Sequence, residues 1–398
     1  MDLPVRFPVM PEFLVVLRLL VATQEIELRD TFIWKQKPQR RKCLWLFCCL
    51  IVGENKMLKE LETIDEIKLP ELPSVRYRKF RGEADYARMV DIANACHVAD
   101  GVEEVLSVEE KANDFAHLKN CDPQTDMIFA EVGSQLVAYG GIEWRDDDEG
   151  NRLYGQEAHV HPDWRSMGLQ RVLYGFNEAR AKQLAGIHPP EKAKWISMWL
   201  SGSAVAEQAL LREWAYAPVR HFFLMRHDLG HTAPIPCAKL PAGIELRPVQ
   251  APEQLRAIWN AKEEAFADHW GHGLRTEEDF RKWRDDPMHE HHLWQVAWDA
   301  NTNEVAGVSV NTIYHADNAH YGFKRGWVDT LGVRRNWRGQ GLAKALLANS
   351  LRKLHVQGMT EAALGVDAAN PTGALQLYEG MGFYSFKESA VWRKRIGE

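Results

Sequence analysis

The sequence contains two copies of one pattern, and this duplication constrains the fold more than any other feature. Three pairs of matching landmarks support it. The strand-like segments "VRYRKF" at 75 and "IELRPV" at 244 are 244 − 75 = 169 residues apart. The Arg-x-x-Gly turns at Arg165 and Arg338 are 338 − 165 = 173 apart, and the segments around Tyr216 and Phe383 are 383 − 216 = 167 apart. Such similar offsets indicate duplication of a unit about 150 residues long, the size of an ordinary domain.

Each copy has the same predicted order of elements: a strand, one or two helices, a hairpin, a long strand, a glycine turn, then a helix, a strand, a helix and final strands. In the second copy we expect strands at 293–299, 304–314, 326–333 and 361–368, and helices at 342–355 and 371–382, the last capped by Asn370. The sequence therefore predicts a mixed α/β (α+β) fold. Its tandem domains, 74–227 and 244–398, are each a mixed, mostly antiparallel sheet flanked by helices, with the proline-rich segment 228–243 as linker.

Composition and charge narrow the classes of partner. With 26% charged residues and a formal charge of −6, the chain has no broad cationic field for a phosphate backbone, so we do not expect nucleic acid as a partner. The six cysteines have no spacing typical of a disulfide framework or a zinc site, which favours a reduced, cytoplasmic protein. The histidines in "HWGH" and "MHEHH" lack further ligands at a defined spacing, so no metal is expected.

The first 56 residues differ from the rest. Their apolar runs, at 13–22 and 43–53, are each shorter than the roughly 20 residues that span a bilayer, so membrane is an unlikely partner. We expect residues 1–56 to be an extension that is disordered or not part of the native fold. A membrane-surface tether and additional packing structure are the alternatives.

The turn before the helix at 342–355 has the chemistry of an anion site. Gly339 and Gly341 allow close backbone approach, unpaired N–H groups face outward at the positive end of the helix, and Arg338 adds a full charge. This combination favours a phosphate or pyrophosphate ligand. The GxGxxG and GxxxxGK[ST] patterns are absent, so neither a dinucleotide fold nor a P-loop is indicated.

The segment from Arg338 to Ala343, followed by "VDAANPTGALQLYEGMGF", resembles the GNAT superfamily of acyl-CoA-dependent N-acyltransferases. The signature of that family is Arg/Gln-x-x-Gly-x-Gly/Ala, which residues 338–343 match at every fixed position. With the duplication, the resemblance covers roughly residues 74–398, and the arrangement is similar to tandem members of the mycothiol synthase type.

The resemblance implies roles for individual residues. Leu331 and Val333 would pair through their backbone with the pantetheine arm, and an exposed amide near Leu331 would stabilise the thioester oxyanion. Asn370 would steady the coenzyme arm, and Tyr378 would protonate the departing thiolate. The amides that would hold the pyrophosphate belong to Gln340, Gly341, Leu342 and Ala343, next to Arg338 and Gly339.

The attacking amine must lose a proton, so a base is needed. Asp329 is the candidate because it precedes Val333 by four residues on one strand and shares a face with Leu331. A carboxylate there could equally bind the substrate ammonium without taking its proton, or be a plain strand-edge aspartate.

The first copy departs from the family pattern. Ser166 and Met167 replace the glycine step, Gln170 stands where Gly or Ala is expected, and Leu211 stands where Tyr378 does. Because leucine cannot donate a proton, we expect this copy to be structural, to wall the substrate cleft, or to bind coenzyme without turnover.

Together these observations predict an N-acetyltransferase that uses acetyl-CoA as co-substrate, needs no metal, and acetylates a primary amine of a small molecule or peptide by direct attack in a ternary complex. The segment 311–327 is expected to rim the acceptor site as a long hairpin loop. A protein lysine or N-terminus is an alternative acceptor, and a catalytically silent acyl-CoA-binding regulator or scaffold is the alternative function.

Overall fold

The computed structural model describes residues 67–230, 235–273, 275–370 and 372–397. Residues Glu66–Glu398 form one compact unit. The expectation for the extension 1–56 falls outside the described residues, as does Pro371. Below, residues 75–228 are called the first repeat and residues 244–395 the second repeat.

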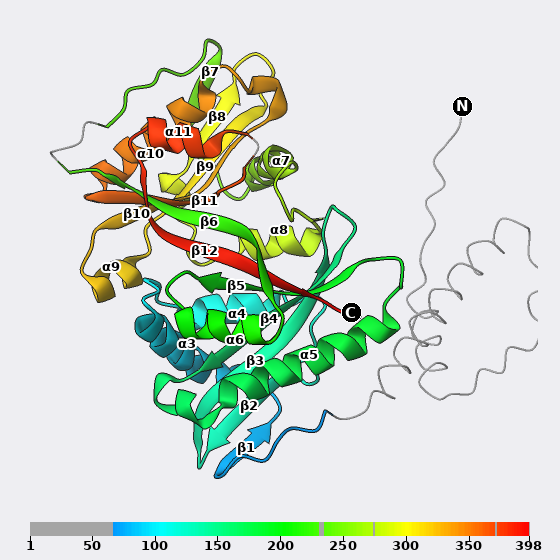
Figure 1. The fold of residues 1–398 in the computed structure, drawn as a ribbon. Helices are drawn as coiled ribbons and strands as arrows, with labels where there is room; N and C mark the ends of the chain where they lie inside the picture. Colours follow the sequence, from blue (N-terminus) through cyan, green and yellow to red (C-terminus); the bar gives the residue numbers. More distant parts are fainter. Residues whose placement is uncertain (1–66, 231–234, 274, 371, 398) are drawn as a thin grey trace, which may run out of the picture. The chain divides into compact units, whose positions relative to one another are not determined.

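The two repeats have matching element orders, in agreement with the predicted duplication (Figure 1). The first repeat consists of β1 (Val75–Arg78), α3 (Tyr86–Asp100), α4 (Val108–Ala116), β2 (Met127–Val132), β3 (Gln135–Asp146), β4 (Arg152–Val160), α5 (Leu169–Ile187), β5 (Lys194–Ser201), α6 (Val205–Glu213) and β6 (Ala217–Asp228). The second consists of β7 (Ile244–Arg247), α7 (Leu255–Phe266), α8 (Glu277–Arg284), β8 (Gln295–Asp299), β9 (Val305–Thr312), α9 (His315–Tyr321), β10 (Arg325–Val333), α10 (Leu342–Val356), β11 (Glu361–Asp367), α11 (Ala374–Gly380) and β12 (Tyr384–Arg395).

All strands join one sheet with the order β1-β2-β3-β4-β5-β12-β6-β11-β10-β9-β8-β7. Among the described strands, only the pairs β4–β5 and β10–β11 are parallel, which confirms the predicted mixed, mostly antiparallel class. The last strand of each repeat is exchanged: β6 lies between β11 and β12, and β12 lies between β5 and β6 (Figure 1). Arg220 of β6 reinforces the exchange with a two-pronged ion pair to Asp367 of β11, at 2.8 and 2.7 Å.

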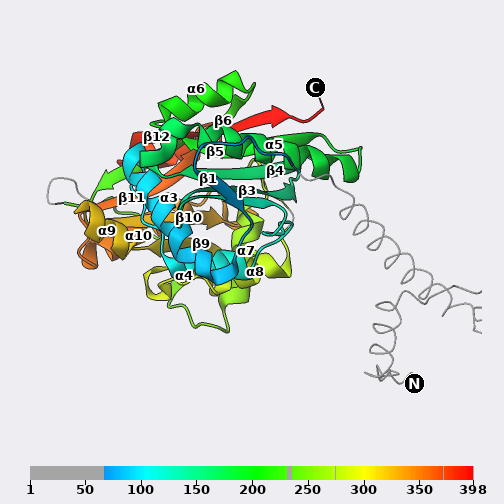
Figure 2. The same cartoon turned by 90° about the horizontal axis from the view of Figure 1, so that it is seen from below.

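Helices pack on the sheet (Figures 1 and 2), and the long helices α5 and α10 do so through apolar stripes. In the first repeat, α5 packs Leu169, Leu173 and Phe176 against one set of strand residues. A separate cluster joins α3 to the alternate residues Phe129 and Tyr139, as expected when successive side chains point to opposite faces.

In the second repeat, α10 buries Leu342, Leu346, Leu347, Leu351 and Leu354, the stripe that the sequence predicts. On α7, Ala265 and Phe266 come close to Gly332 of β10. A Cβ on this glycine would lie 2.8 Å from Ala265 and 3.0 Å from Phe266. The contact therefore requires the small residue, and it fixes α7 beside the end of β10.

Strand and helix predictions in the second repeat are confirmed for 293–299, 304–314, 326–333, 361–368 and 342–355, with ends shifted by at most two residues. Two details are wrong. The last helix begins at Ala374 rather than at 371, and Asn370 does not cap it, because Gly373 at φ 75° forms the helix start without any side-chain cap. The expected hairpin loop 311–327 contains the helix α9.

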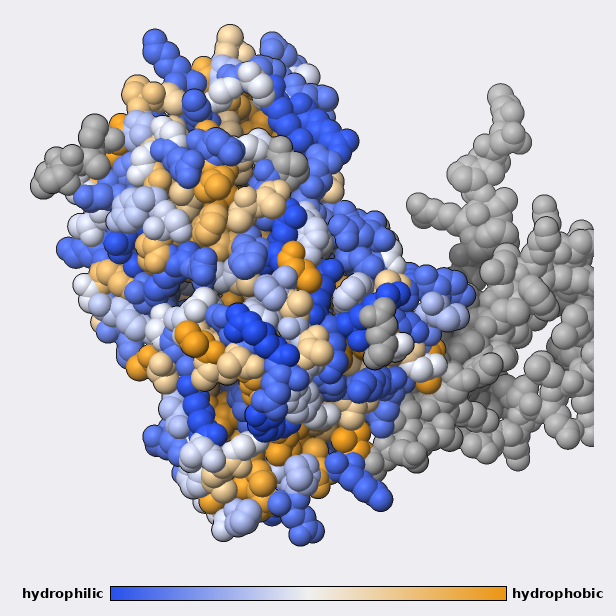
Figure 3. All heavy atoms as spheres, in the orientation of Figure 1, coloured by the Kyte–Doolittle hydropathy of each residue, from blue (hydrophilic) through white to orange (hydrophobic). Residues whose placement is uncertain are grey.

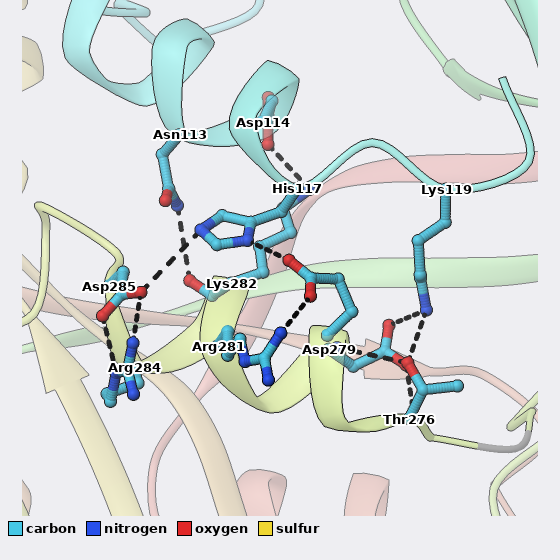
Figure 4. Close-up of polar contacts among 11 residues, drawn as sticks. Asn113, Asp114, His117, Lys119, Thr276, Asp279, Arg281, Lys282, Arg284 and Asp285 are labelled. Atoms are coloured by element: carbon cyan, nitrogen blue, oxygen red, sulfur yellow. Dashed lines mark hydrogen bonds and ion pairs between the residues drawn. The ribbon is translucent and has the colours of Figure 1, made fainter. Parts of the chain in front are cut away.

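Polar contacts also link the repeats through α4 and α8 (Figure 4). His117, after α4, hydrogen-bonds to Glu278, and Lys282 of α8 forms an ion pair with Asp114 at 2.7 Å. Lys119 pairs with Asp279 at the beginning of α8. These ion pairs and hydrogen bonds thus join the two repeats in addition to the shared sheet.

The face drawn in Figure 3 is mainly polar, with apolar side chains scattered among charged ones, as is usual for globular proteins. None of the described helices combines the length and apolar character that a bilayer crossing requires.

Candidate functional site

The predicted glycine turn is an open helix entrance. Gly339 at φ 75° and Gly341 at φ 83° both occupy the left-handed region, and a Cβ at either position would meet no atom within 4 Å. Gly341 begins α10, and no side chain caps the helix there. The backbone from Gly339 to Gly341 is exposed. The first amides of α10 therefore face outward, as in helix-terminal anion sites.

Arg338 holds this turn in place. Its Nε donates to the carbonyl of Val333 at 3.0 Å, and its Nη2 donates to that of Ala265 at the end of α7 at 3.0 Å. Its Nη1 pairs with Asp268 at 3.2 Å, and hydrogen bonds from Arg335 and Arg338 lower the pKa of that carboxyl. The arginine thus links β10, the turn and α7, in addition to bringing positive charge.

The neighbouring strands separate beside the turn. The parallel pairing of β10 with β11 covers only Arg325–Trp327 against Glu361–Ala363 and extends no further in the described sheet. The rest of β10, including Leu331 and Val333, pairs with β9 alone. Its other edge can therefore take up an extended chain.

A β-bulge interrupts β10 at the predicted base. The register with β9 shifts between Val328 and Thr330, so Asp329 is the extra, unpaired residue. Bulges re-aim a side chain and are frequent next to active sites. The corresponding pairing of β4 with β3 in the first repeat runs without interruption from Ala138 opposite Val160 to Asp146 opposite Arg152. The bulge therefore distinguishes the second repeat from the first.

The environment of Asp329 suits proton transfer near neutral pH. The Asp329 side chain is exposed to solvent in the cavity. Desolvation by the protein atoms around it nevertheless raises its pKa to about 6, the charge of Asp286 adds to this, and hydrogen bonds from Thr312 and Tyr314 oppose it. The Tyr314 hydroxyl donates to Oδ1 at 3.5 Å. Tyr314 was not among the predicted site residues. The only sequence signal for it was its place in the segment expected to rim the acceptor site.

The other predicted residues lie around the opening between β10 and β11. Tyr378 of α11 is 8% exposed, packs against Phe383, and burial raises its pKa to about 12. Leu331 and Val333 are partly buried against the apolar clusters below the strand. Leu342 is buried, Ala343 is partly buried, and Gln340 is exposed with its amide 3.5 Å from the carbonyl of Asn336.

Asn370 lies in the loop between β11 and α11. Its Oδ1 accepts from the backbone N–H of Thr372 at 2.8 Å and from the hydroxyl of the same residue at 2.6 Å. The asparagine therefore fixes a local turn before the helix, on the β11 side of the opening.

The corresponding turn of the first repeat has one left-handed glycine instead of two. Gly168, at φ 78°, begins α5 without a side-chain cap, as Gly341 begins α10. Ser166 stands in place of Gly339 and lies within a 3-10 helix, Pro162–Met167, that is longer than its counterpart Arg335–Trp337. Arg165 is bound by Asp100 in a two-pronged pair at 2.7 and 2.6 Å. Behind the turn, Gln170 donates to Glu207 at 3.0 Å, so polar side chains occupy the place where the second repeat has Ala343 and Ala374.

A cavity of about 1180 Å³ adjoins the second repeat's strand opening. From the second repeat it is lined by Tyr314, Asp317, Arg325, Trp327, Asp329 and β12. From the first repeat it is lined by the end of α3 and the loop after it, by β4, β5 and α6, and by Arg165 and Gln170 at that repeat's own turn. Sequence reasoning did not find this contribution of the first repeat beyond the general suggestion of a cleft wall.

The histidines considered for a metal pack against aromatic rings. The His289 ring lies edge-on to Trp283 and Trp294, at 5.2 and 4.9 Å between centroids, and burial lowers its pKa to about 4. Among the described residues, no group of three or more His, Cys, Asp or Glu is placed to hold a metal ion.

The separating parallel pair and the glycine-opened helix entrance agree with the acyltransferase class that the sequence resembles. Residues 255–383 match the model of the acetyltransferase (GNAT) family. A mycothiol acetyltransferase of Salinispora tropica is 33% identical over 264 residues, covering 66% of this chain and 78% of the relative. One from Thermobispora bispora is 29% identical over 265 residues, covering 66% and 81%. The chain belongs to the GNAT family of acetyltransferases and is an acyltransferase.

Solved structures support the same fold. A GCN5-related N-acetyltransferase from Sphaerobacter thermophilus is 26% identical, with a TM-score of 0.59 over 83% of this chain and 97% of that one. A tandem GNAT protein from the clavulanic acid biosynthesis pathway, 15% identical, has a TM-score of 0.57 over 81% and 99%. This second likeness concerns the fold alone.

Proposed function

We propose that this chain transfers an acetyl group from acetyl-CoA to a primary amine of a small molecule or peptide, in the cytoplasm and by direct attack in a ternary complex. One observation carries the proposal. The turn at the start of α10 has both Gly339 and Gly341 in the left-handed region and exposed, whereas the first repeat keeps only Gly168 and has Ser166 in place of Gly339.

The coenzyme end of the site is built from main chain. Amides from Gln340 to Ala343 would hold the diphosphate, with Arg338 keeping the turn open through its contacts with Val333 and Ala265. The free edge of β10 would pair with the pantetheine arm, with Asn370 across the opening. Side-chain identity matters less here than backbone geometry.

Two side chains would move protons. Asp329 would take a proton from the acceptor ammonium, and the freed nitrogen would attack the thioester carbon while the carbon–sulfur bond breaks. Tyr378 would give its hydroxyl proton to the departing thiolate, and the second proton that the nitrogen loses as the amide forms would return to the tyrosinate. Its raised pKa keeps it protonated at neutral pH, so it is available as a donor in each turnover. A strand amide near the bulge would stabilise the oxyanion.

The first repeat would wall the acceptor cavity without binding coenzyme. Burial raises the pKa of Glu207, and the Glu207–Gln170 pair places polar side chains where the second repeat has Ala374 and Ala343. Leu211, at the position of Tyr378, is fully buried. Each feature opposes coenzyme binding or proton donation in this repeat.

Release of free thiol from acetyl-CoA in the presence of an amine panel tests the transfer. With an accepted amine, Tyr378→Phe should lower kcat about 100-fold and leave acetyl-CoA affinity unchanged, because only the proton donor is removed. Tyr384→Phe, at an exposed tyrosine of β12, is the matched control and should behave as wild type. Unchanged turnover in Tyr378→Phe would eliminate this donor. Absence of thiol release with every amine would refute the transfer.

Isothermal titration with acetyl-CoA tests the assignment to one repeat. We expect one site per chain, abolished by Arg338→Glu, which places a second carboxylate beside Asp268 and breaks the clamp on the turn. Arg88→Glu, at an exposed position of α3, controls for the charge reversal. Two tight sites per chain would contradict the assignment of coenzyme binding to the second repeat alone.

A further inference from the structure

The second repeat contains a helix that the first repeat replaces with a short turn. Between β9 and β10 the chain forms α9 within residues 313–324, whereas β3 and β4 are joined by residues 147–151 alone. The added helix lies at the end of the second repeat that faces the first (Figure 1). Connections that differ between related units often carry function, and this one belongs to the repeat that contains Asp329.

Tyr314 stands at the start of α9 and reaches the proposed base. Its backbone carbonyl accepts from the N–H of Asn318 at 3.1 Å as the helix begins. Its hydroxyl donates to Oδ1 of Asp329 at 3.5 Å, and its ring lies edge-on to Trp327 at 6.3 Å between centroids. Tyr314, Trp327 and Asp329 line the same cavity. Hydrogen bonds of this length are common in catalytic sites and tighten when a substrate is bound.

The tyrosine hydroxyl is a lasting donor to this carboxylate. Burial raises the pKa of Tyr314 far above its ordinary value, and nearby negative charges add to this, namely those of Asp329, Asp286, Glu104 and Glu110. The phenol therefore keeps its proton when Asp329 ionises. Its hydrogen bond stabilises the ionised form of Asp329, so it lowers the pKa of that carboxyl in opposition to desolvation. It also restricts the rotation of the carboxylate.

The first repeat holds α9 in place through the loop after α3. The backbone N–H of Val105 donates to Oδ1 of Asp317, a helix residue that is 4% exposed, at 2.8 Å. At the last residue of the helix, the Tyr321 hydroxyl donates to the carbonyl of Val102 at 2.9 Å. Main-chain groups of the first repeat thus fix α9 near both of its ends.

The junction between α9 and β10 is fixed as well. Asn318 binds the backbone of Arg325 twice, donating to its carbonyl at 3.0 Å and accepting from its N–H at 3.1 Å. The buried Arg325 guanidinium pairs with Glu103 of the first repeat at 2.7 Å and with Glu361 of β11 at 2.6 Å. The helix is therefore held in one position relative to the strand that carries the base.

We propose that Tyr314 is a positioning residue for the base Asp329, and that the first repeat contributes to catalysis by anchoring α9 and with it this tyrosine. The inference rests on the proposed acetyl transfer. It gives the first repeat, which has Leu211 at the place of the proton donor, a part in the reaction of the second repeat.

Tyr314→Phe tests the positioning role. Loss of the hydrogen bond destabilises ionised Asp329, so the acidic limb of the kcat/KM profile should move to higher pH by about 0.5 to 1. At the plateau, kcat should fall about threefold to tenfold with KM within about twofold of wild type, since a less ordered carboxylate is a poorer base. An unmoved limb would refute the positioning role, and a raised KM with an unmoved limb would assign Tyr314 to acceptor binding instead.

Tyr321→Phe combined with Glu103→Gln tests the contribution of the first repeat. The two changes remove the hydroxyl that donates to Val102 and the ion pair with Arg325 at nearly unchanged volume. The limb should move in the same direction as in Tyr314→Phe, by a smaller amount. Added to Tyr314→Phe, they should have no further effect on the limb, because all three changes act through one hydrogen bond. Additive effects, or a limb identical to that of wild type, would overturn the anchoring role.

Two controls separate this effect from others. Burial raises the pKa of Asp317 to about 6, so this carboxyl titrates in the same range. Asp317→Asn keeps an oxygen for the Val105 N–H without titrating, and the limb should stay in place. Tyr384→Phe, at the tyrosine whose hydroxyl accepts from Arg226 at 3.0 Å, controls for the loss of a phenol and should also keep the limb. A limb that disappears in Asp317→Asn would assign the titration to Asp317 and refute the proposal.

An NMR titration of the Asp329 carboxyl carbon keeps the test independent of turnover. The signal, identified by its loss in Asp329→Asn, should have a higher midpoint in Tyr314→Phe than in wild type. Equal midpoints refute the positioning role. If the midpoint moves but no amine is acetylated, the proposed acetyl transfer fails while the positioning of Asp329 by Tyr314 stands.

Discussion

At the scale of single residues, Asp329 combines a structural irregularity with a shifted acidity. The bulge leaves it outside the β9–β10 ladder, and desolvation with the nearby charge of Asp286 raises its pKa to about 6. The sequence supplied the candidate from its position four residues before Val333. The bulge could not be predicted, because it depends on pairing with β9.

The pH profile of Asp329→Asn separates the three roles considered for this residue. If Asp329 is the base, its deprotonated form is active, so wild-type kcat/KM should rise with pH to a plateau above about pH 6. The variant should lose about 100-fold at pH 8 and lack that limb. A raised KM at unchanged kcat would instead indicate ammonium binding, and no effect would leave a strand-edge aspartate.

A substitution at Asp286 checks whether Asp329 is the group that causes the acidic limb of the pH profile. Asp286→Asn removes a negative charge that raises the pKa of Asp329, so the acidic limb should move to lower pH while the plateau persists. If the limb stays where it is, a group other than Asp329 is titrating.

At the scale of elements, the two repeats differ mainly in how the strand enters the following helix. Gly339 in the left-handed region opens the second turn, whereas the equivalent Ser166 lies within a 3-10 helix. This difference could be predicted, because glycine alone adopts such φ values at little cost. The start of α11 could not be predicted as well, since Asn370 and Gly373 are both plausible helix starts and only the loop geometry selects Gly373.

Gly339→Ser tests the importance of the open turn. The substitution should weaken acetyl-CoA binding at least about tenfold, because serine resists a positive φ by about 1–2 kcal/mol and favours the 3-10 conformation that Ser166 has in the first repeat. Gly358→Ser, at φ 84° after α10, imposes the same strain away from the turn and should leave binding unchanged. Calorimetric titration measures both. Equal losses in the two variants would mean that strain alone, and not the open turn, is responsible.

At the scale of the whole molecule, the repeats share one sheet through exchanged strands. Duplication and the element order were readable from the sequence, since both depend on local patterns. The exchange was not, because it is decided by pairing between strands more than 100 residues apart, such as β6 with β11 and β12. The predicted boundary at 244 therefore separates the second repeat from a strand that completes its core, which includes Met225 and Leu229.

This exchange predicts how fragments behave. A fragment of residues 244–398 lacks β6, so β11 has an open edge, β12 loses both neighbours, and the cluster around Met225 is incomplete. We expect it to aggregate, since an unpaired apolar edge recruits other chains. A fragment beginning at Ala217 restores β6 and should recover solubility, a cooperative thermal transition and acetyl-CoA binding, as judged by size-exclusion chromatography, calorimetry and titration. A monomeric 244–398 fragment with full acetyl-CoA affinity would contradict this dependence and favour a self-sufficient second repeat.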